Sequence, residues 1–143
     1  MKVPLIILSM SLMLACSTTP QPIHYGSDAC VFCQMTIVDR QHAAQVVTVK
    51  GKSYKYDAIE CMMNDLRRWK HPDAELLLVS DYASPGTLTD ATTAHYLISE
   101  DIPSPMGEFL TAFSTRELRD AQSVEKGEKL NWEALRIKFQ HTH

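Results

Sequence analysis

The chain has 143 residues, with 14 lysines and arginines against 17 aspartates and glutamates, and a net charge of −3 with neutral histidines. This length accommodates one compact domain or two very small ones. A slightly acidic chain lacks the basic footprint of nucleic-acid-binding proteins, so we expect no nucleic-acid partner.

The N-terminus has the pattern of a secretory signal. Lys2 precedes an apolar run that ends just before Cys16 and is too short to span a bilayer. The residues before Cys16 resemble the lipobox of bacterial lipoproteins, although Met13 stands where leucine is usual. We therefore expect a signal peptide at 1–15, followed by a lipidated cysteine and a polar tether at 16–23. The alternative is an ordinary signal peptide in which the cysteine is incidental.

Acylation of Cys16 implies a location outside the cytoplasm. The mature protein would be anchored to a bacterial membrane, either the outer membrane or the periplasmic face of the inner membrane. The lipid bilayer is then an expected partner.

The first half of the mature chain has strand, strand, helix and strand patterns. Residues 44–50 are β-branched and apolar, Gly51 marks a tight turn, and 54–56 alternate like a second strand. A helix follows Asp57, which resembles an N-cap, and Glu60 stands at the position of a capping box.

That predicted helix has one apolar stripe at helical spacing. The stripe contains Ile59, Met62, Met63, Leu66 and Trp69. His71-Pro72 is expected to end the helix, and the apolar run at 74–82 predicts a buried strand.

The second half repeats this order. Strands are expected at 93–100 and 108–113, separated by a loop at 104–107. Ser114, with Glu117 at the capping-box position, predicts a helix that runs to about residue 124.

A terminal helix is expected from Asn131. The fold is therefore expected to be α+β, with two similar small halves at about 24–84 and 85–143. Together they form one compact domain at 24–143, because neither half alone has enough core.

Three cysteines remain once Cys16 carries lipid, and an odd number is unusual for a disulfide framework. Cys30-x-x-Cys33 fits a redox dithiol, a structural disulfide, or part of a zinc site completed by Cys61 and a histidine. Gln34 excludes c-type haem attachment, which needs histidine there.

A fourth interpretation adds methionine. Met35 lies two residues after Cys33, and thiolate and thioether donors together select Cu(I) over hard ions. Met106 lies in a loop between proline and glycine, where a core role is less automatic than for Met62 and Met63.

Three segments of the chain resemble the NosL family, the lipoprotein accessory factors of nitrous oxide reductase. These segments are HYGSDACVFCQMTI, KSYKYDAIECMMNDL and SPMGEFLTAF, and the resemblance runs from about His24 to Val124. It implies an α+β fold with two similar halves. It also implies a protein that is not an enzyme but binds one Cu(I) outside the cytoplasm and delivers it to the copper-accepting maturation machinery of that reductase.

The resemblance also ranks the candidate copper ligands. Cys30, Cys33 and Met106 rank first, Met35 next, and His24 is a fourth candidate. By helical spacing, Cys61 projects away from the apolar stripe, so its part in the site stays open. The C-terminal His141 and His143 are more simply explained as a solvated end.

Two other functions stay open. One is a membrane-anchored thiol-disulfide oxidoreductase that uses Cys30 and Cys33. The other is a lipoprotein that stores or senses a soft metal with the same ligands, without delivering it.

Overall fold

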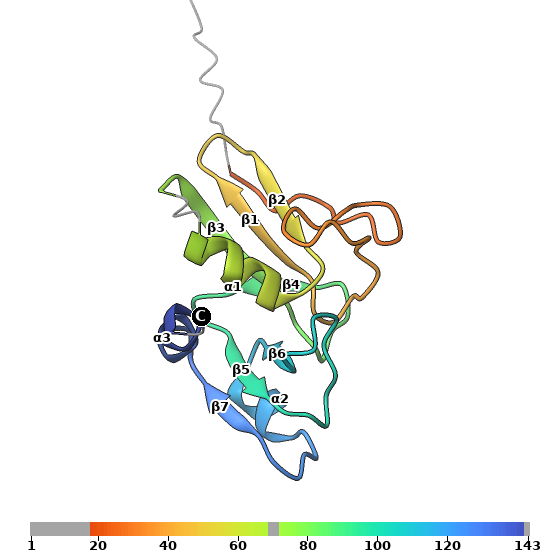
Figure 1. Ribbon diagram of the computed structural model, residues 1–143, viewed down its shortest axis with the longest axis vertical. Helices are drawn as coiled ribbons and strands as arrows, with labels where there is room; N and C mark the ends of the chain where they lie inside the picture. The colour runs from red at the N-terminus through yellow and green to blue at the C-terminus, as the bar shows by residue number, and fades with distance from the viewer. Residues whose placement is uncertain (1–17, 69–71, 142–143) are drawn as a thin grey trace, which may run out of the picture.

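The computed structural model describes residues 18–68 and 72–141, which form seven strands and three helices (Figure 1). In chain order they are β1 (Ala44–Thr48), β2 (Ser53–Tyr56), α1 (Ile59–Arg68), β3 (Ala74–Ser80), β4 (Leu88–Asp90), β5 (His95–Ile98), β6 (Leu110–Phe113), α2 (Arg116–Asp120), β7 (Glu128–Leu130) and α3 (Trp132–His141). The α+β class expected from the sequence is confirmed.

Four antiparallel strands form the first sheet, in the order β2-β1-β3-β4. The central strand β1 has the sequence AQVVT and is buried along its whole length, as its β-branched composition favours. Gly51 has φ +79 in the turn to β2, a conformation that glycine adopts without strain. The predicted hairpin is therefore present, with Ala44 opposite Tyr56.

Three antiparallel strands form the second sheet, in the order β6-β5-β7. The sequence predicted β5 and β6 but neither β4 nor β7, which have only three residues each. Such short edge strands have too few residues for an alternation of apolar and polar side chains to be recognisable in the sequence.

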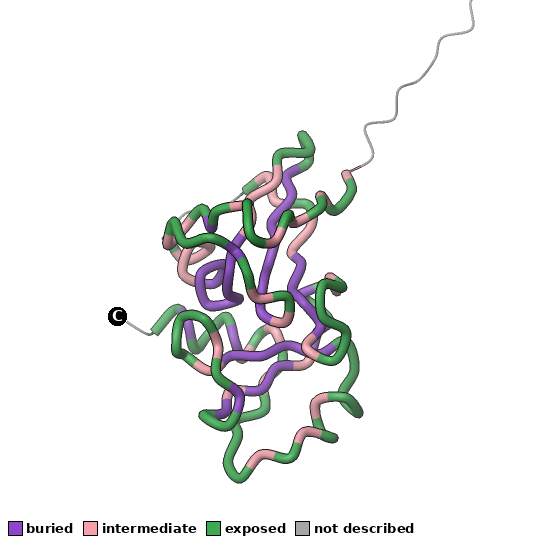
Figure 2. The backbone as a smooth tube through the Cα atoms, turned by 90° about the vertical axis from the view of Figure 1, so that its right-hand side faces the viewer, coloured by how far each residue is buried: buried purple, intermediate pink, exposed green. Residues whose placement is uncertain are grey.

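Helix α1 lies between the two sheets and contacts both of them. It packs on β1 and β2, and its other neighbours are β6 and α3 (Figure 1). Ile59, Met62 and Met63 of the predicted stripe are buried, and Leu66 packs partly buried against them. Trp69 lies outside the described residues. Figure 2 shows that the buried parts of the chain gather where α1 and the sheets meet.

Helix α2 begins one residue later than the sequence suggested and is shorter. Its N-cap is Thr115, whose hydroxyl accepts from the N–H of Leu118 at 3.2 Å. Ser114, expected to be the cap, instead donates to Asp81 Oδ2 at 2.6 Å. The helix ends at Asp120 rather than near residue 124. The error arose because two adjacent hydroxyl residues are equally good caps by sequence.

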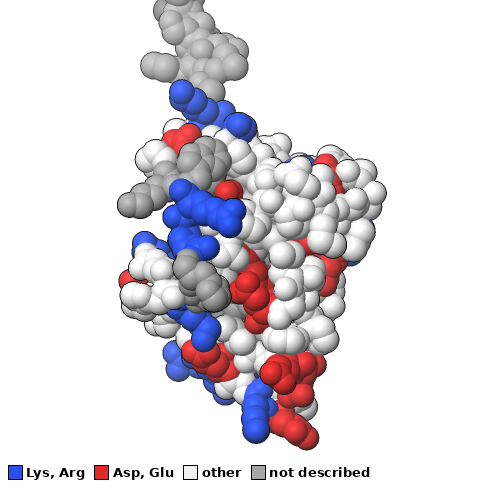
Figure 3. All heavy atoms as spheres, in the orientation of Figure 1, with Lys and Arg blue, Asp and Glu red and all other residues white. Residues whose placement is uncertain are grey.

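In the view of Figure 3, Lys and Arg side chains gather along the left edge, on the side of α1 and α3, whereas the upper right of the same face carries few charges. In the described part of the chain, no helix combines the length and the apolar composition needed to cross a membrane. The predicted signal peptide and Cys16 lie outside the described residues.

Candidate metal centre

A loop ahead of β1 carries Cys30 and Cys33. It is fixed to β2, because the N–H of Val31 donates to the carbonyl of Lys55 at 3.0 Å. The ammonium group of Lys55 also pairs with Asp28 Oδ2 at 2.6 Å. The loop is therefore attached to the first sheet at Lys55, rather than carried as a free tail.

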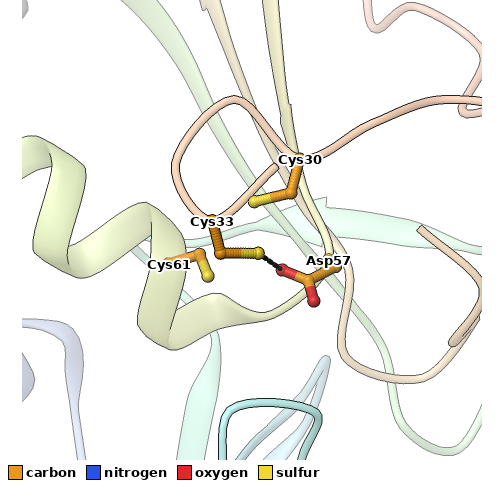
Figure 4. Close-up of side chains that lie close together, drawn as sticks. All are labelled: Cys30, Cys33, Asp57 and Cys61. Atoms are coloured by element: carbon orange, nitrogen blue, oxygen red, sulfur yellow. Dashed lines mark hydrogen bonds between the residues drawn. The ribbon is translucent and has the colours of Figure 1, made fainter. Parts of the chain in front are cut away.

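The start of α1 brings two more donor groups to the same place. Asp57 directly follows β2, and Cys61 lies in the first turn of the helix. The Cys33 thiol donates to Asp57 Oδ1 at 3.2 Å. In Figure 4 the side chains of Cys30, Cys33, Asp57 and Cys61 point toward one another. One ligand atom from each of the four lies within 4.8 Å of all the others.

The four donors are shielded from solvent to different extents. Cys30 and Cys61 are fully buried, Asp57 is 3% exposed, and Cys33 is partly exposed. All three cysteines are free thiols. Access to the cluster is therefore on the Cys33 side.

The thiols differ in acidity because they share hydrogen bonds. A hydrogen bond from Cys61, together with the backbone N–H groups of Cys33, Asp57 and Phe32, lowers the pKa of Cys30 to about 6. The same Cys30–Cys61 bond raises the pKa of Cys61, and burial raises that of Cys33 to about 11. Among the three thiols, neighbouring donors therefore favour the thiolate form at Cys30.

The other predicted ligands are exposed side chains. Met35 is 54% exposed and Met106 is 38% exposed. His24 is exposed on the surface, and its ring lies 3.5 Å from Asp28 Oδ2. Their part in metal binding stays a prediction.

The turn that carries Met106 is nevertheless bound to α1 close to the thiols. The Ser104 hydroxyl donates to the carboxylate of Glu60, which is the neighbour of Cys61 in the chain. The N–H of Phe109 donates back to Ser104 Oγ at 2.9 Å. The turn therefore lies against the same end of the helix that carries Cys61.

Sequence reasoning left Cys61 open and did not consider Asp57 as a ligand. Helical spacing placed Cys61 away from the apolar stripe. In a helix that is covered on one face only, that position would be exposed. The loop at 24–37 covers that second face as well, so Cys61 is buried. A recognisable signal was the position of Asp57 and Cys61, which flank the start of a helix directly after a hairpin.

Among the described residues, the C-terminal His141 does not join the cluster of four donors. His141 lies at the exposed end of α3, and His143 is outside the described residues.

Three thiols and a carboxylate converging in a small α+β domain define a candidate soft-metal-binding protein. A family model gives the particular family: the NosL model matches residues 22–135, and the chain belongs to the NosL family. The resemblance stated from the sequence is thereby confirmed. No curated protein sequence matches the chain significantly.

A solved structure shares this fold. It is the crystal structure of the copper chaperone NosL from Shewanella denitrificans, which is 17% identical in sequence with a TM-score of 0.69. The match covers 82% of this chain and 95% of that one. At this level of identity the likeness shows the fold.

Proposed function

We propose that this protein binds one Cu(I) outside the cytoplasm and delivers it for the maturation of nitrous oxide reductase. The observation that carries the proposal is the convergence of Cys30, Cys33 and Cys61, from two separate elements, within 4.8 Å. Thiolates are soft ligands that select Cu(I) over hard cations. Membership of the NosL family and the fold shared with a copper chaperone support the same conclusion.

Methionine donors at the surface suit a site that must release its metal. Met35 and Met106 are both exposed and border segments that are anchored to the cluster. A copper ion held by buried thiols on one side and an exposed thioether on the other offers a partner an accessible coordination position. The incoming ligand then binds before the last thiolate leaves, so copper is never free.

The exposed apolar residues suit a protein partner. Among the described residues, seven large hydrophobic side chains are exposed. Four of them belong to the loop with the thiols or to the Met106 turn: Val31, Met35, Val38 and Met106. Exposed apolar side chains grouped around a site favour docking of another protein. We propose the copper-accepting maturation machinery of the reductase as that partner.

Titration of the reduced protein against a Cu(I)-specific chelator tests the site. We expect one Cu(I) per chain, and a fall in affinity of about tenfold or more for Cys30→Ser and for Met106→Ala, because each removes a sulfur ligand. Leu118→Ala is the matched control for the methionine, since Leu118 is 37% exposed and lies on α2. Unchanged affinity in both ligand variants would contradict the assignment.

Location and delivery need their own measurements. We propose that acylated Cys16 anchors the protein to a membrane. We expect the wild-type protein to incorporate radiolabelled palmitate and Cys16→Ala to lose this label.

Delivery predicts copper transfer from the loaded protein to the maturation machinery. A protein that only stores or senses metal would keep its copper in that assay.

A thiol-disulfide oxidoreductase is a second candidate, because the lowered pKa of Cys30 favours the thiolate form that such chemistry uses. Reduction of insulin disulfides by the metal-free protein would support it. The burial of Cys30 and the third thiol beside it favour metal binding.

A further inference from the structure

The segment through which the chain enters the domain is fixed to the first sheet. The N–H of Gln21 donates to Gln45 Oε1 at 2.9 Å, and Gln45 Nε2 donates to the carbonyl of Gln21 at 2.8 Å. Gln45 is fully buried in β1, and Ile23 packs partly buried against the core. The described part of the expected tether, residues 18–23, is therefore held against β1 at Gln21.

This attachment limits how far the domain can move from a membrane in which acylated Cys16 is embedded. Cys16 precedes Gln21 by five residues, and five residues of extended chain span at most about 18 Å. The end of the domain where the chain enters must therefore stay close to the lipid headgroups. Figure 1 shows the β1–β2 turn at that same end, and the view turned by 90° in Figure 2 agrees.

The β1–β2 turn is rigid and presents one apolar and two basic side chains. The N–H of Gly51 donates to the carbonyl of Thr48 at 2.8 Å, and the N–H of Lys52 donates to Thr48 Oγ1 at 3.1 Å. Val49 is 49% exposed, and Lys50 and Lys52 are exposed. An apolar side chain beside long-stemmed ammonium groups suits the boundary between acyl chains and headgroups.

The opposite end of the molecule is acidic. Figure 3 shows a group of acidic side chains there, and a pocket beside β5 and β7 is lined by one lysine and by Glu100, Asp101, Glu125 and Glu128. An anionic surface therefore repels this end and attracts the two lysines of the turn. Asp73 and Glu75, beside the turn at the start of β3, offset part of that attraction. The lysines thus add to a lipid anchor and do not replace it.

We propose that residues 49–52 contact the surface of an anionic phospholipid bilayer and so fix the orientation of the anchored domain. Val49 enters the headgroup region, and the ammonium groups of Lys50 and Lys52 pair with lipid phosphates. The inference goes beyond the proposed anchor by adding a second lipid contact and an orientation. It rests on the proposed acylation of Cys16 and is independent of the metal that the protein binds.

Lysine labelling of the acylated protein on vesicles tests the contact. The vesicles consist of phosphatidylcholine, alone or mixed with phosphatidylglycerol, and mass spectrometry follows acetylation of each lysine by a neutral reagent. We expect Lys50 and Lys52 to react about fivefold more slowly on the anionic vesicles, because lipid phosphates pair with their ammonium groups. Lys126 and Lys129, which are exposed on the second sheet's side of the molecule, should react equally on both.

Matched double variants test whether the two lysines cause the contact. Hydrogen exchange of the turn amides should be slower on anionic than on neutral vesicles in the wild type. Lys50→Gln combined with Lys52→Gln should abolish this difference. Lys126→Gln combined with Lys129→Gln is the control, because it removes two exposed lysines elsewhere, and it should keep the difference.

Three results would overturn the contact. Equal reactivity of Lys50 and Lys52 on the two vesicles, in protein that floats with both, would remove the contact and leave the anchor standing. Equal slowing of Lys126 and Lys129 on the anionic vesicles would remove the orientation. Protein that floats with neither vesicle would remove the anchor and the contact together. Failure of the copper proposal is seen separately, in the chelator titration.

Discussion

The site depends on single residues in backbone conformations or environments that are unusual for their type. Gln34 adopts φ +67 although it has a side chain, and its amide donates to the carbonyl of Val31 at 3.0 Å. Left-handed backbone costs a non-glycine residue about 1–2 kcal/mol. The conformation closes the turn that holds both cysteines, because the N–H of Gln34 donates to the carbonyl of Cys30 at 3.0 Å.

Gln34→Gly should therefore stabilise the protein. We expect the free energy of unfolding to rise by about 1 kcal/mol, because glycine adopts this φ without strain. Urea denaturation measures the change. Gln122→Gly is the matched control, since Gln122 makes a similar bond to the carbonyl of Leu118 at 2.9 Å but has no positive φ. The control should lose stability, and a gain in both variants would contradict the strain argument.

Helix α1 connects the candidate metal site with the second sheet. Its first turn carries Cys61 into the cluster, and the preceding Asp57 accepts from the Cys33 thiol. Between them, Glu60 is fully buried, and its carboxylate accepts from the Ser104 hydroxyl and from the N–H of Leu110 at 3.3 Å. Glu60, which the sequence suggested as a capping-box residue, thus binds β6 and the turn before that strand.

Burial raises the pKa of Glu60, so this carboxyl favours the neutral form more in the folded than in the unfolded chain. Its contribution to stability is present below the unfolded pKa and is lost as the pH rises through the folded pKa. The wild-type protein should therefore lose more stability between pH 5 and pH 8 than Glu60→Gln does.

Urea denaturation at the two pH values measures this difference. Glu117→Gln is the matched control, because Glu117 occupies the same place in the first turn of α2 but is exposed. It should keep the wild-type pH dependence. The same pH dependence in Glu60→Gln as in the wild type would show that ionisation of Glu60 is not the cause.

The larger of the two hydrophobic clusters among the described residues is shared by both sheets. Buried residues from β1, α1, β5, β6 and α3 belong to a single cluster, which includes Ile59, Tyr96, Leu110, Leu135 and Phe139. Cys30 and Cys61 belong to the same cluster, so the site is built into the core rather than added to its surface. We expect the two sheets to unfold together.

Leu135→Ala tests this expectation. Leu135 lies on α3 and is fully buried, so the variant should lose about 2–5 kcal/mol of stability in a single transition. Ile137→Ala on the same helix is the control, because Ile137 is 48% exposed and should change stability by about 0.5 kcal/mol or less. Two separate transitions, by circular dichroism and by fluorescence, would show that the halves unfold independently.

The division into two similar halves stays a prediction, with which strand order is compatible. In β2-β1-β3 and in β6-β5-β7 the first strand is central, and a helix connects the second strand to the third. By this correspondence Ser114 matches Asp57 and Leu118 matches Cys61, so the second half lacks the donors. The first sheet also includes β4 and so reaches Asp90, beyond the boundary near residue 84 suggested by the sequence.

The sequence by itself determined the class, the larger elements and two of the four donors in the cluster. Hydrophobic periodicity is local, so β1, β2, α1 and α3 were all recognisable, and Cys30 and Cys33 lie three residues apart. The tertiary structure alone decided that Asp57 and Cys61 complete the cluster. Helical spacing shows which residues share a face, but whether a face is exposed depends on what packs against it. Here a loop about thirty residues earlier in the chain covers that face, and no local pattern contains that contact.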